Sequence, residues 1–200
     1  MPERQVTDRA AMLDVLRAGR VAHVGVVDAD GQPRVIPVAY GVDGDEAIIL
    51  HGATSSQLFR ALAAGAPVCV TVTMLDGLVV ANSSFNSSMN YRCVIVFGRA
   101  DVVAEEEKER VLERLSEHLF PGHGSTFRPL QAQELKATTV VRVPLTEMSM
   151  KSRDFGADDA QDNDPQRWSG VLPIHSQFGE PIPGDHVQVP TPEHIQHWRP

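Results

Sequence analysis

A long polar segment runs directly into a β-branched segment near the middle of this chain. Residues 83–90 read Ser-Ser-Phe-Asn-Ser-Ser-Met-Asn, and residues 91–99 read Tyr-Arg-Cys-Val-Ile-Val-Phe-Gly-Arg. Because side chains alternate across a strand, Arg92 shares a face with Val94 and Val96. An arginine among apolar neighbours requires an anion, unless it lies at the strand end and reaches water. Both interpretations stay open from this segment alone.

Short strands and tight turns dominate the first 150 residues. The Asp-Gly pairs near residues 31 and 44 favour hairpins, because glycine supplies the positive φ that tight turns need. We predict strands over 21–27, 32–40, 47–51, 68–73, 78–82, 91–103, 138–144 and 147–149, the fourth and fifth joined by a turn at 75–77. Helices are predicted over 7–16, 55–64, 105–115 and 130–135. Many strands without a repeated βα unit predict a closed antiparallel barrel of the α+β class, with flanking helices.

The composition changes from residue 156 onward, where aspartates are followed by scattered prolines. Such a segment cannot build a core of its own. Trp168 and Trp198 nevertheless argue against complete disorder, because disordered tails seldom keep large aromatic residues. We therefore predict one domain over 1–155 and an extended tail over 156–200, which packs on the barrel or on a partner subunit.

Charge and hydropathy exclude several classes of protein. The net charge of −8 argues against a nucleic-acid partner. No apolar run approaches the ~20 residues of a membrane span, and the N-terminus has no hydrophobic leader, so we expect a cytoplasmic protein without a membrane contact. Cys69 and Cys93 fall in apolar strand patterns and predict buried thiols in a reducing compartment. His194 and His197 lack a third ligand nearby, so we expect no metal site.

Several segments together resemble the flavin-nucleotide-binding proteins of the pyridoxamine 5'-phosphate oxidase-like split-barrel superfamily, and within it the nitroimidazole-resistance reductases. The resemblance extends from about Arg20 to Met150. It is carried by residues 19–25, 33–40, 51–53, 68–73 with 76–79, and 89–92 with 96–99. It implies an antiparallel split β-barrel that binds FMN at the interface of a homodimer.

The Arg-x-x-Pro strand is the first candidate cofactor segment. Pro37 has no amide hydrogen, which confines it to a strand edge, and a free edge can bind a flat polar ring. The resemblance implies that this strand lines the flavin ring through Arg34, Val35, Ile36, Pro37 and Val38. An ordinary edge strand with an exposed arginine is the alternative.

The segment that opens the helix predicted after residue 54 is the second candidate. Backbone amides at a helix start favour a phosphate, and hydroxyls add donors. Related proteins carry Lys or Arg here, whereas this chain offers neutral donors unless Arg60 or Arg92 reaches the phosphate. The expected cofactor residues in this group are Thr54, Ser55, Ser56, Gln57 and Arg60, together with Asn90, Tyr91 and Arg92.

His51 is the candidate catalytic residue and also a candidate cofactor contact. An imidazole with an ordinary pKa of about 6.5 suits proton donation near neutral pH, and the resemblance places this histidine close to the flavin. A histidine that only binds backbone groups is the alternative. Phe85, Asn86 and Ser87 are expected at the substrate pocket, where related proteins carry a histidine pair in place of the last two residues. This departure implies an altered substrate or a lost reaction.

The resemblance thus predicts an FMN-dependent oxidoreductase of a small organic molecule, with NADH or NADPH as possible electron donor. Two alternatives remain open. One is a non-catalytic module that binds or stores flavin or haem. The other is a specialised biosynthetic enzyme on the same fold with a different ligand.

Overall fold

The computed structural model describes residues 4–28, 30–158 and 164–198. Its five α-helices are α1 (Arg9–Ala18), α2 (Gln57–Ala63), α3 (Lys108–Leu119), α4 (Ala132–Ala137) and α5 (Glu193–Gln196). Its ten strands are β1 (Gln5–Val6), β2 (Val21–Val27), β3 (Pro33–Asp43), β4 (Ala47–Ala53), β5 (Pro67–Val80), β6 (Ser88–Arg99), β7 (Asp101–Val102), β8 (Thr138–Pro144), β9 (Glu147–Arg153) and β10 (Gly170–Pro173). Residue 29 of the predicted first hairpin turn and residues 159–163 of the predicted tail lie outside the described residues.

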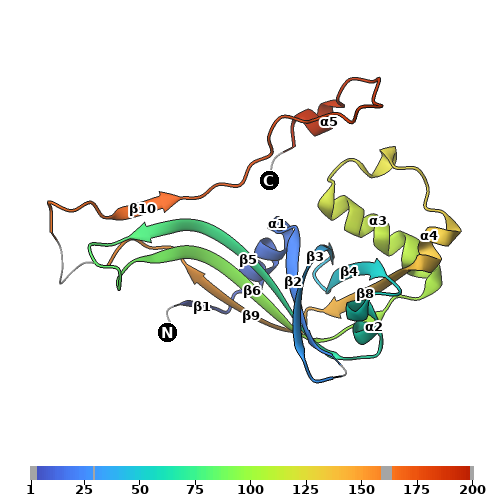
Figure 1. Cartoon of the computed structure of the whole chain (residues 1–200), viewed down its shortest axis with the longest axis horizontal. Helices are drawn as coiled ribbons and strands as arrows, with labels where there is room; N and C mark the ends of the chain where they lie inside the picture. The colour runs from blue at the N-terminus through green and yellow to red at the C-terminus, as the bar shows by residue number, and fades with distance from the viewer. Residues whose placement is uncertain (1–3, 29, 159–163, 199–200) are drawn as a thin grey trace.

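All ten strands form one antiparallel sheet in the order β1-β9-β6-β5-β2-β3-β4-β8-β7, with β10 added to β5. This path does not return to its start, so the predicted α+β class is confirmed but the barrel is open, as in a split barrel, rather than closed. The opening arises because β3 changes partner along its length. It pairs with β2 over residues 33–39 and with β4 only over residues 40–43. Strands β3 and β4 therefore diverge on the N-terminal side of Tyr40, where residues 33–39 of β3 have no partner in β4 (Figure 1).

The core fills the inner face of this curved sheet. The apolar stripe of α1, which includes Val15 and Leu16, packs there against buried strand residues such as Val24, Val70 and Leu50. Tyr40 is fully buried among them, and its hydroxyl donates a hydrogen bond to the Leu16 carbonyl at 2.5 Å. A separate cluster packs α3 against the sheet through Val111 and Leu115 on the helix and Ile49, Val103 and Val140 on the strands.

Strands β5 and β6 form a long arm that extends away from the barrel (Figure 1). The two strands predicted over 68–73 and 78–82 are wrong, because β5 is one continuous strand with a bulge between Leu75 and Gly77. The bulge places the Asp76 carboxylate against Arg92 of β6. A side-chain pair across the arm therefore replaces the turn that the Asp-Gly sequence predicted.

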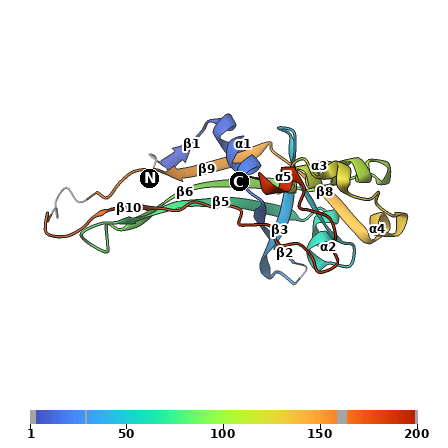
Figure 2. The ribbon, with the colours of Figure 1, turned by 90° about the horizontal axis from the view of Figure 1, so that it is seen from above.

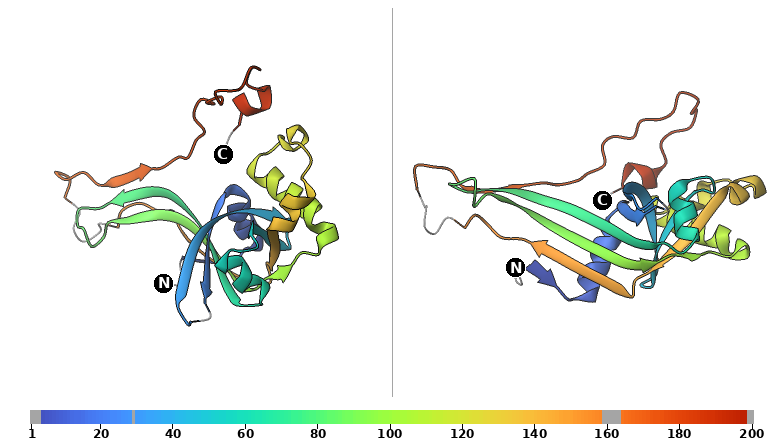
Figure 3. Two further views of the ribbon diagram at one scale, coloured as in Figure 1. Left: turned by 45° about the vertical axis from the view of Figure 1, so that its right-hand side comes forward. Right: turned by 60° about the horizontal axis from the view of Figure 1, so that its bottom comes forward.

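The tail turns back from the end of this arm along the barrel (Figure 2). Strand β10 pairs with the outer edge of β5, from Gly170 opposite Val80 to Pro173 opposite Gly77. Both views in Figure 3 show the following segment running back towards α3, where α5 lies. Within the described ranges, no helix is long and apolar enough to cross a membrane.

Candidate functional site

The split between β3 and β4 brings together two of the predicted cofactor segments. One side of the split is the β3 edge over residues 33–39, which pairs with β2 but not with β4. The other side is the end of β4, residues 51–53, which pairs with β8. The turn into α2 continues from there. Arg34–Val38 and His51–Arg60 thus border one opening.

The β3 side of the split is exposed and carries unpaired backbone groups. Val35 is 67% exposed, and Pro37 lies on the same outward face. Arg34 is not free, because its Nε donates to Asp28 Oδ2 at 2.6 Å. Hydrogen bonds from the Gln32 amide and from Arg34 lower the pKa of Asp28. This edge therefore offers a neutral, flat surface with backbone donors and acceptors.

The α2 side offers hydroxyls and a single cation. The helix begins at Gln57, two residues later than predicted, because residues 53–56 form a turn in which the Ser56 amide bonds the Ala53 carbonyl. Ser56 makes no side-chain cap, and Thr54, Ser55 and Gln57 lie close by. Arg60 is exposed and forms no ion pair with any residue the structure describes.

The third predicted group does not join the split within one chain. Arg92 forms a two-pronged ion pair with Asp76 at 2.9 and 2.7 Å, so its anion is a carboxylate of the same arm. Asn90 is buried, and its Oδ1 accepts from Arg153 Nη1 at 2.5 Å. Neighbouring Tyr91 lies on the same arm, opposite Arg153.

The predicted substrate residues also lie on this arm, at its tip. Phe85 is 94% exposed there. Asn86 and Ser87 bond Ser83 within the same loop, through the Asn86 amide and the Ser87 hydroxyl. Figure 1 shows the tip at the opposite end of the molecule from α2, so these residues reach a cofactor site only if a second chain brings one.

The thiols differ from expectation as well. Cys69 and Cys93 are half-buried rather than buried, because both point to the outward face of the sheet. Cys93 Sγ accepts a hydrogen bond from Thr73 Oγ1 at 3.3 Å.

A cavity of about 1340 Å³ lies between α3, the loop over residues 120–131, α4 and the end of β4. This cavity was not predicted from the sequence. Its apolar walls are Leu112, Leu115, Leu119, Phe120, Phe127, Pro129 and Leu130. The sequence of α3 contained one sign of the cavity. Leu112 and Leu119 lie beside the core residues Val111 and Leu115, so the apolar side of the helix is wider than packing against one core requires.

His51 is the histidine in the wall of this cavity. Its Nδ1 atom is buried and has no hydrogen-bond partner among the described residues. Burial lowers the pKa of the imidazole, so the neutral form dominates at neutral pH. A neutral, unpartnered imidazole is suited to bind a metal ion, whereas the predicted proton donor would need the charged form.

Three arginines line the solvent side of the same cavity. Arg110, Arg114 and Arg128 have roughly half-exposed side chains and pair with Glu107, Asp43 and Glu134, respectively. The Arg128 contact is two-pronged, at 2.9 and 2.5 Å, and it lowers the pKa of Glu134 to about 2. The cavity therefore combines apolar walls, one half-buried imidazole and a rim of mixed charge, in which the three arginines lie among Glu109, Glu113, Glu117 and Glu134.

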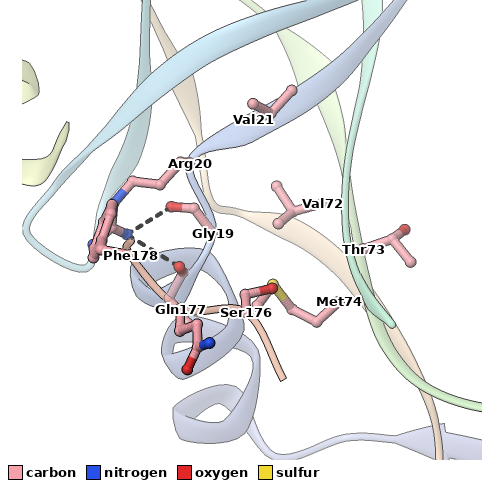
Figure 4. A pocket seen from close by; sticks show the side chains of 10 residues that line it. Gly19, Arg20, Val21, Val72, Thr73, Met74, Ser176, Gln177 and Phe178 are labelled. Carbon is pink, nitrogen blue, oxygen red and sulfur yellow. Dashed lines mark hydrogen bonds between the residues drawn. The ribbon is translucent and has the colours of Figure 1, made fainter. Parts of the chain in front are cut away.

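A smaller pocket of about 320 Å³ lies between the end of α1, β5 and the tail (Figure 4). Its walls include Gly19, Arg20, Val72 and Met74, and the tail residues Ser176, Gln177 and Phe178 close one side. Arg20 Nη1 donates to the carbonyls of Arg17, Ala18 and Gly19, each at 3.0 Å. This guanidinium therefore caps the end of α1.

Comparisons with solved structures find close overall similarity to two proteins. One is the FAD and heme binding protein from Mycobacterium smegmatis, 35% identical, with a TM-score of 0.89 over 96% of this chain and 95% of that chain. The other is the flavocytochrome Anf3 from Azotobacter vinelandii, 34% identical, with a TM-score of 0.90 over 98% of this chain and 92% of that chain.

A putative 5-nitroimidazole antibiotic resistance protein from Bacteroides thetaiotaomicron shares the fold at 20% identity, with a TM-score of 0.62 over 74% of this chain and 85% of that chain. None of the curated proteins compared is similar enough to count as a match. The family model for pyridoxamine 5'-phosphate oxidase matches residues 8–152. This match and the split-barrel topology confirm the predicted family: the chain belongs to the pyridoxamine 5'-phosphate oxidase family of flavin-binding split barrels.

Proposed function

We propose that this protein is a homodimeric redox protein that binds flavin in the split between β3 and β4 and haem in the cavity beside α3. The observation that carries the haem assignment is the half-buried imidazole of His51 in the wall of a large cavity, where it makes no hydrogen bond with another described residue. The two solved structures that are 35% and 34% identical to this chain are described as a FAD and heme binding protein and a flavocytochrome. For the reaction, we retain the predicted transfer of electrons between NADH or NADPH and a small organic molecule.

The residues at the split fit a flavin. The unpaired β3 edge offers backbone donors and acceptors to the polar rim of a planar ring, and Val35 and Pro37 offer apolar contact. Thr54, Ser55 and Arg60 are the donors available to a phosphate. With Arg60 as the single unpaired cation there, binding of FMN depends mainly on neutral hydrogen bonds. FAD would add contact area through its second phosphate and adenine.

The residues at the cavity fit a haem. Its porphyrin needs apolar walls, its iron needs a neutral nitrogen ligand and its propionates need cations. Leu112, Leu119 and Phe127 would supply the walls and His51 the nitrogen, and the propionates would share the rim arginines Arg110, Arg114 and Arg128 with their present carboxylate partners. When bound, flavin supplies hydride and single-electron chemistry and haem supplies single-electron chemistry. His51 Nδ1 is buried from water, and Asp43 and Glu134 fix two of the rim arginines.

Spectroscopy of the full chain tests this function. Titration with FMN, FAD and haem should give saturable binding of one flavin and one haem per chain, and mass spectrometry identifies the flavin that copurifies. Anaerobic addition of NADH or NADPH should bleach the flavin absorbance. If both cofactors bind but neither NADH nor NADPH bleaches the flavin, the nicotinamide-linked reaction is contradicted. The alternative of a non-catalytic protein that binds or stores flavin or haem would then remain. Absence of a saturable Soret band would refute the haem site.

We expect the chain to be a dimer whose interface includes the outward face of β2, β5 and β6. The outward residues nearest His23 and Thr71 are uncharged, Val21 and Phe97 are exposed there, and Arg99 lies at the margin of this face, at the end of β6. An exposed sheet face of this kind is usually covered by a partner. Thr71→Arg places a charge at its centre and should convert the dimer to monomer.

Analytical ultracentrifugation at micromolar concentration measures this change. Gln133→Arg, on exposed α4, is the matched control and should stay dimeric. Because the arm residues Asn90–Arg92 lie far from the split of their own chain, the monomeric variant should also lose flavin affinity. A wild-type monomer, or a Thr71→Arg dimer, would contradict the proposed interface.

A further inference from the structure

The tail after β10 is held at both ends on the barrel, and we name residues 174–198 the strap. At its start, the Ile174 amide donates to the Asp76 carbonyl at 2.9 Å. Phe178 then lines the small pocket beside Arg20 (Figure 4). Its ring also lies 5.7 Å from that of Trp198, which connects the middle of the strap to its end.

The end of the strap is fastened to the loop that follows α3. The indole of Trp198 stacks on Phe120, with ring centroids 6.2 Å apart, and its Nε1 donates to the Pro121 carbonyl at 3.2 Å. His194 on α5 faces His123 of the loop, with Nε2 of the first 2.8 Å from Nδ1 of the second. We name these four side chains and the Pro121 carbonyl the latch.

The loop held by the latch is also a wall of the large cavity. Phe120, Gly124, Ser125 and Phe127 line that cavity. The loop is mostly exposed, and its own anchors are few: the Gly122 amide bonds Glu117 Oε1, and the His123 amide bonds the Phe120 carbonyl. Release of the strap would therefore loosen this wall.

The contact between His123 and His194 depends on how many protons the two imidazole rings carry. At 2.8 Å one nitrogen must carry a hydrogen and the other a lone pair, which is possible with neutral rings or with one extra proton. When both rings are protonated, two N–H groups and two positive charges face each other. Imidazole titrates around neutral to mildly acidic pH, so this state forms in acid.

Other charged groups near the pair modify this response without removing it. Glu117 on α3 accepts a hydrogen bond from the amide of Gly122, the residue before His123. On α5, Glu193 precedes His194, and His197 follows at the end of the helix. The remaining neighbours of His123, the rings of Phe127 and Trp198, are uncharged.

We propose that the strap is a proton-sensitive latch on the cavity: it holds the 120–127 loop closed at neutral pH and releases it when His123 and His194 are both protonated. The release itself is a property of the chain alone. Its effect on haem exchange rests on the function proposed above.

Tryptophan fluorescence tests the release without any cofactor. In a Trp168→Phe background, the emission reports Trp198 alone, and it should shift to longer wavelength between pH 7.5 and pH 5. Adding His194→Gln or His123→Gln removes one titrating ring but keeps a group that can donate a hydrogen bond. Loss of the shift in either variant supports the latch. Absence of the shift in the Trp168→Phe protein, or its persistence in both glutamine variants, overturns it.

Haem loss to excess apomyoglobin tests the effect on the cavity. At pH 5.5 the wild type should lose haem roughly two- to tenfold faster than His194→Gln, which is the effect of one hydrogen bond on an opening equilibrium. At pH 7.5 the two rates should agree. Acid would weaken a His51–iron bond equally in both proteins, so it does not change the ratio of their rates of haem loss. If the protein takes up no haem, the proposed function fails, whereas the fluorescence result still decides on the latch.

Discussion

Replacing His51 with Ala should weaken haem binding by at least about a hundredfold. Mutation of residues that only hydrogen-bond to a metal ligand already lowers metal affinity about 10- to 100-fold. The imidazole lines the cavity, and its buried Nδ1 makes no hydrogen bond with another described residue. No other histidine lines the cavity among the described residues. Haem titration followed by the Soret band measures the change.

Two controls separate loss of a ligand from loss of the fold. His175→Ala removes an exposed imidazole from the tail and should bind haem as the wild type does. In His51→Ala, added free imidazole should restore the spectrum of a nitrogen-ligated iron, because the deletion leaves space at the cavity wall. An unchanged Soret band in His51→Ala would show that the iron ligand lies elsewhere.

The same residue sets the pH dependence. Only the neutral imidazole can bind iron, and burial lowers the pKa of His51, so the protonated form appears only at more acidic pH than for an exposed histidine. We expect haem affinity to be level between pH 7 and 8 and to fall only below the usual titration range of imidazole, about pH 6.5. Haem titrations across this range check the expectation.

The parts of the fold that local signals determine could be predicted from the sequence. The hairpins around Gly31 and Gly44 were predicted from Asp-Gly pairs, and both glycines have positive φ in the structure. The exposed β3 edge around Pro37 was predicted from the missing amide hydrogen. Each of these predictions depends on neighbouring residues only.

The features that were missed depend on contacts between distant residues. The ion pair between Arg92 and Asp76 was not predicted, and it forms because the bulge in β5 brings Asp76 opposite Arg92. The barrel was expected to close, but β3 exchanges β2 for β4 at Tyr40, a change that no local pattern announces. Strand β10 is four residues long and forms by pairing with β5. The cavity likewise requires α3, α4 and β4 together.

The position of α3, which carries three of the seven apolar residues of the cavity wall, depends on a glycine in β3. A Cβ atom added at Gly41 would lie 2.6 Å from Leu115 Cα and 3.0 Å from Leu115 Cβ. The nearest obstacle is helix backbone, which cannot rotate away as a side chain can. Leu115 also lines the cavity on its other side, so displacement of α3 changes the cavity as well as the core.

We therefore expect Gly41→Ala to lower the free energy of unfolding by about 2–3 kcal/mol, the cost of overpacking a core that cannot relax. For a chain of this length, that corresponds to a decrease in Tm of about 5–10 °C. Gly156→Ala is the matched control, since nothing lies within 4 Å of its added Cβ. Thermal denaturation of both variants measures the difference. A Gly41→Ala protein that unfolds at the wild-type temperature and binds haem as well as the wild type would show that α3 can move away from β3 without cost, and that the cavity wall does not depend on this close packing.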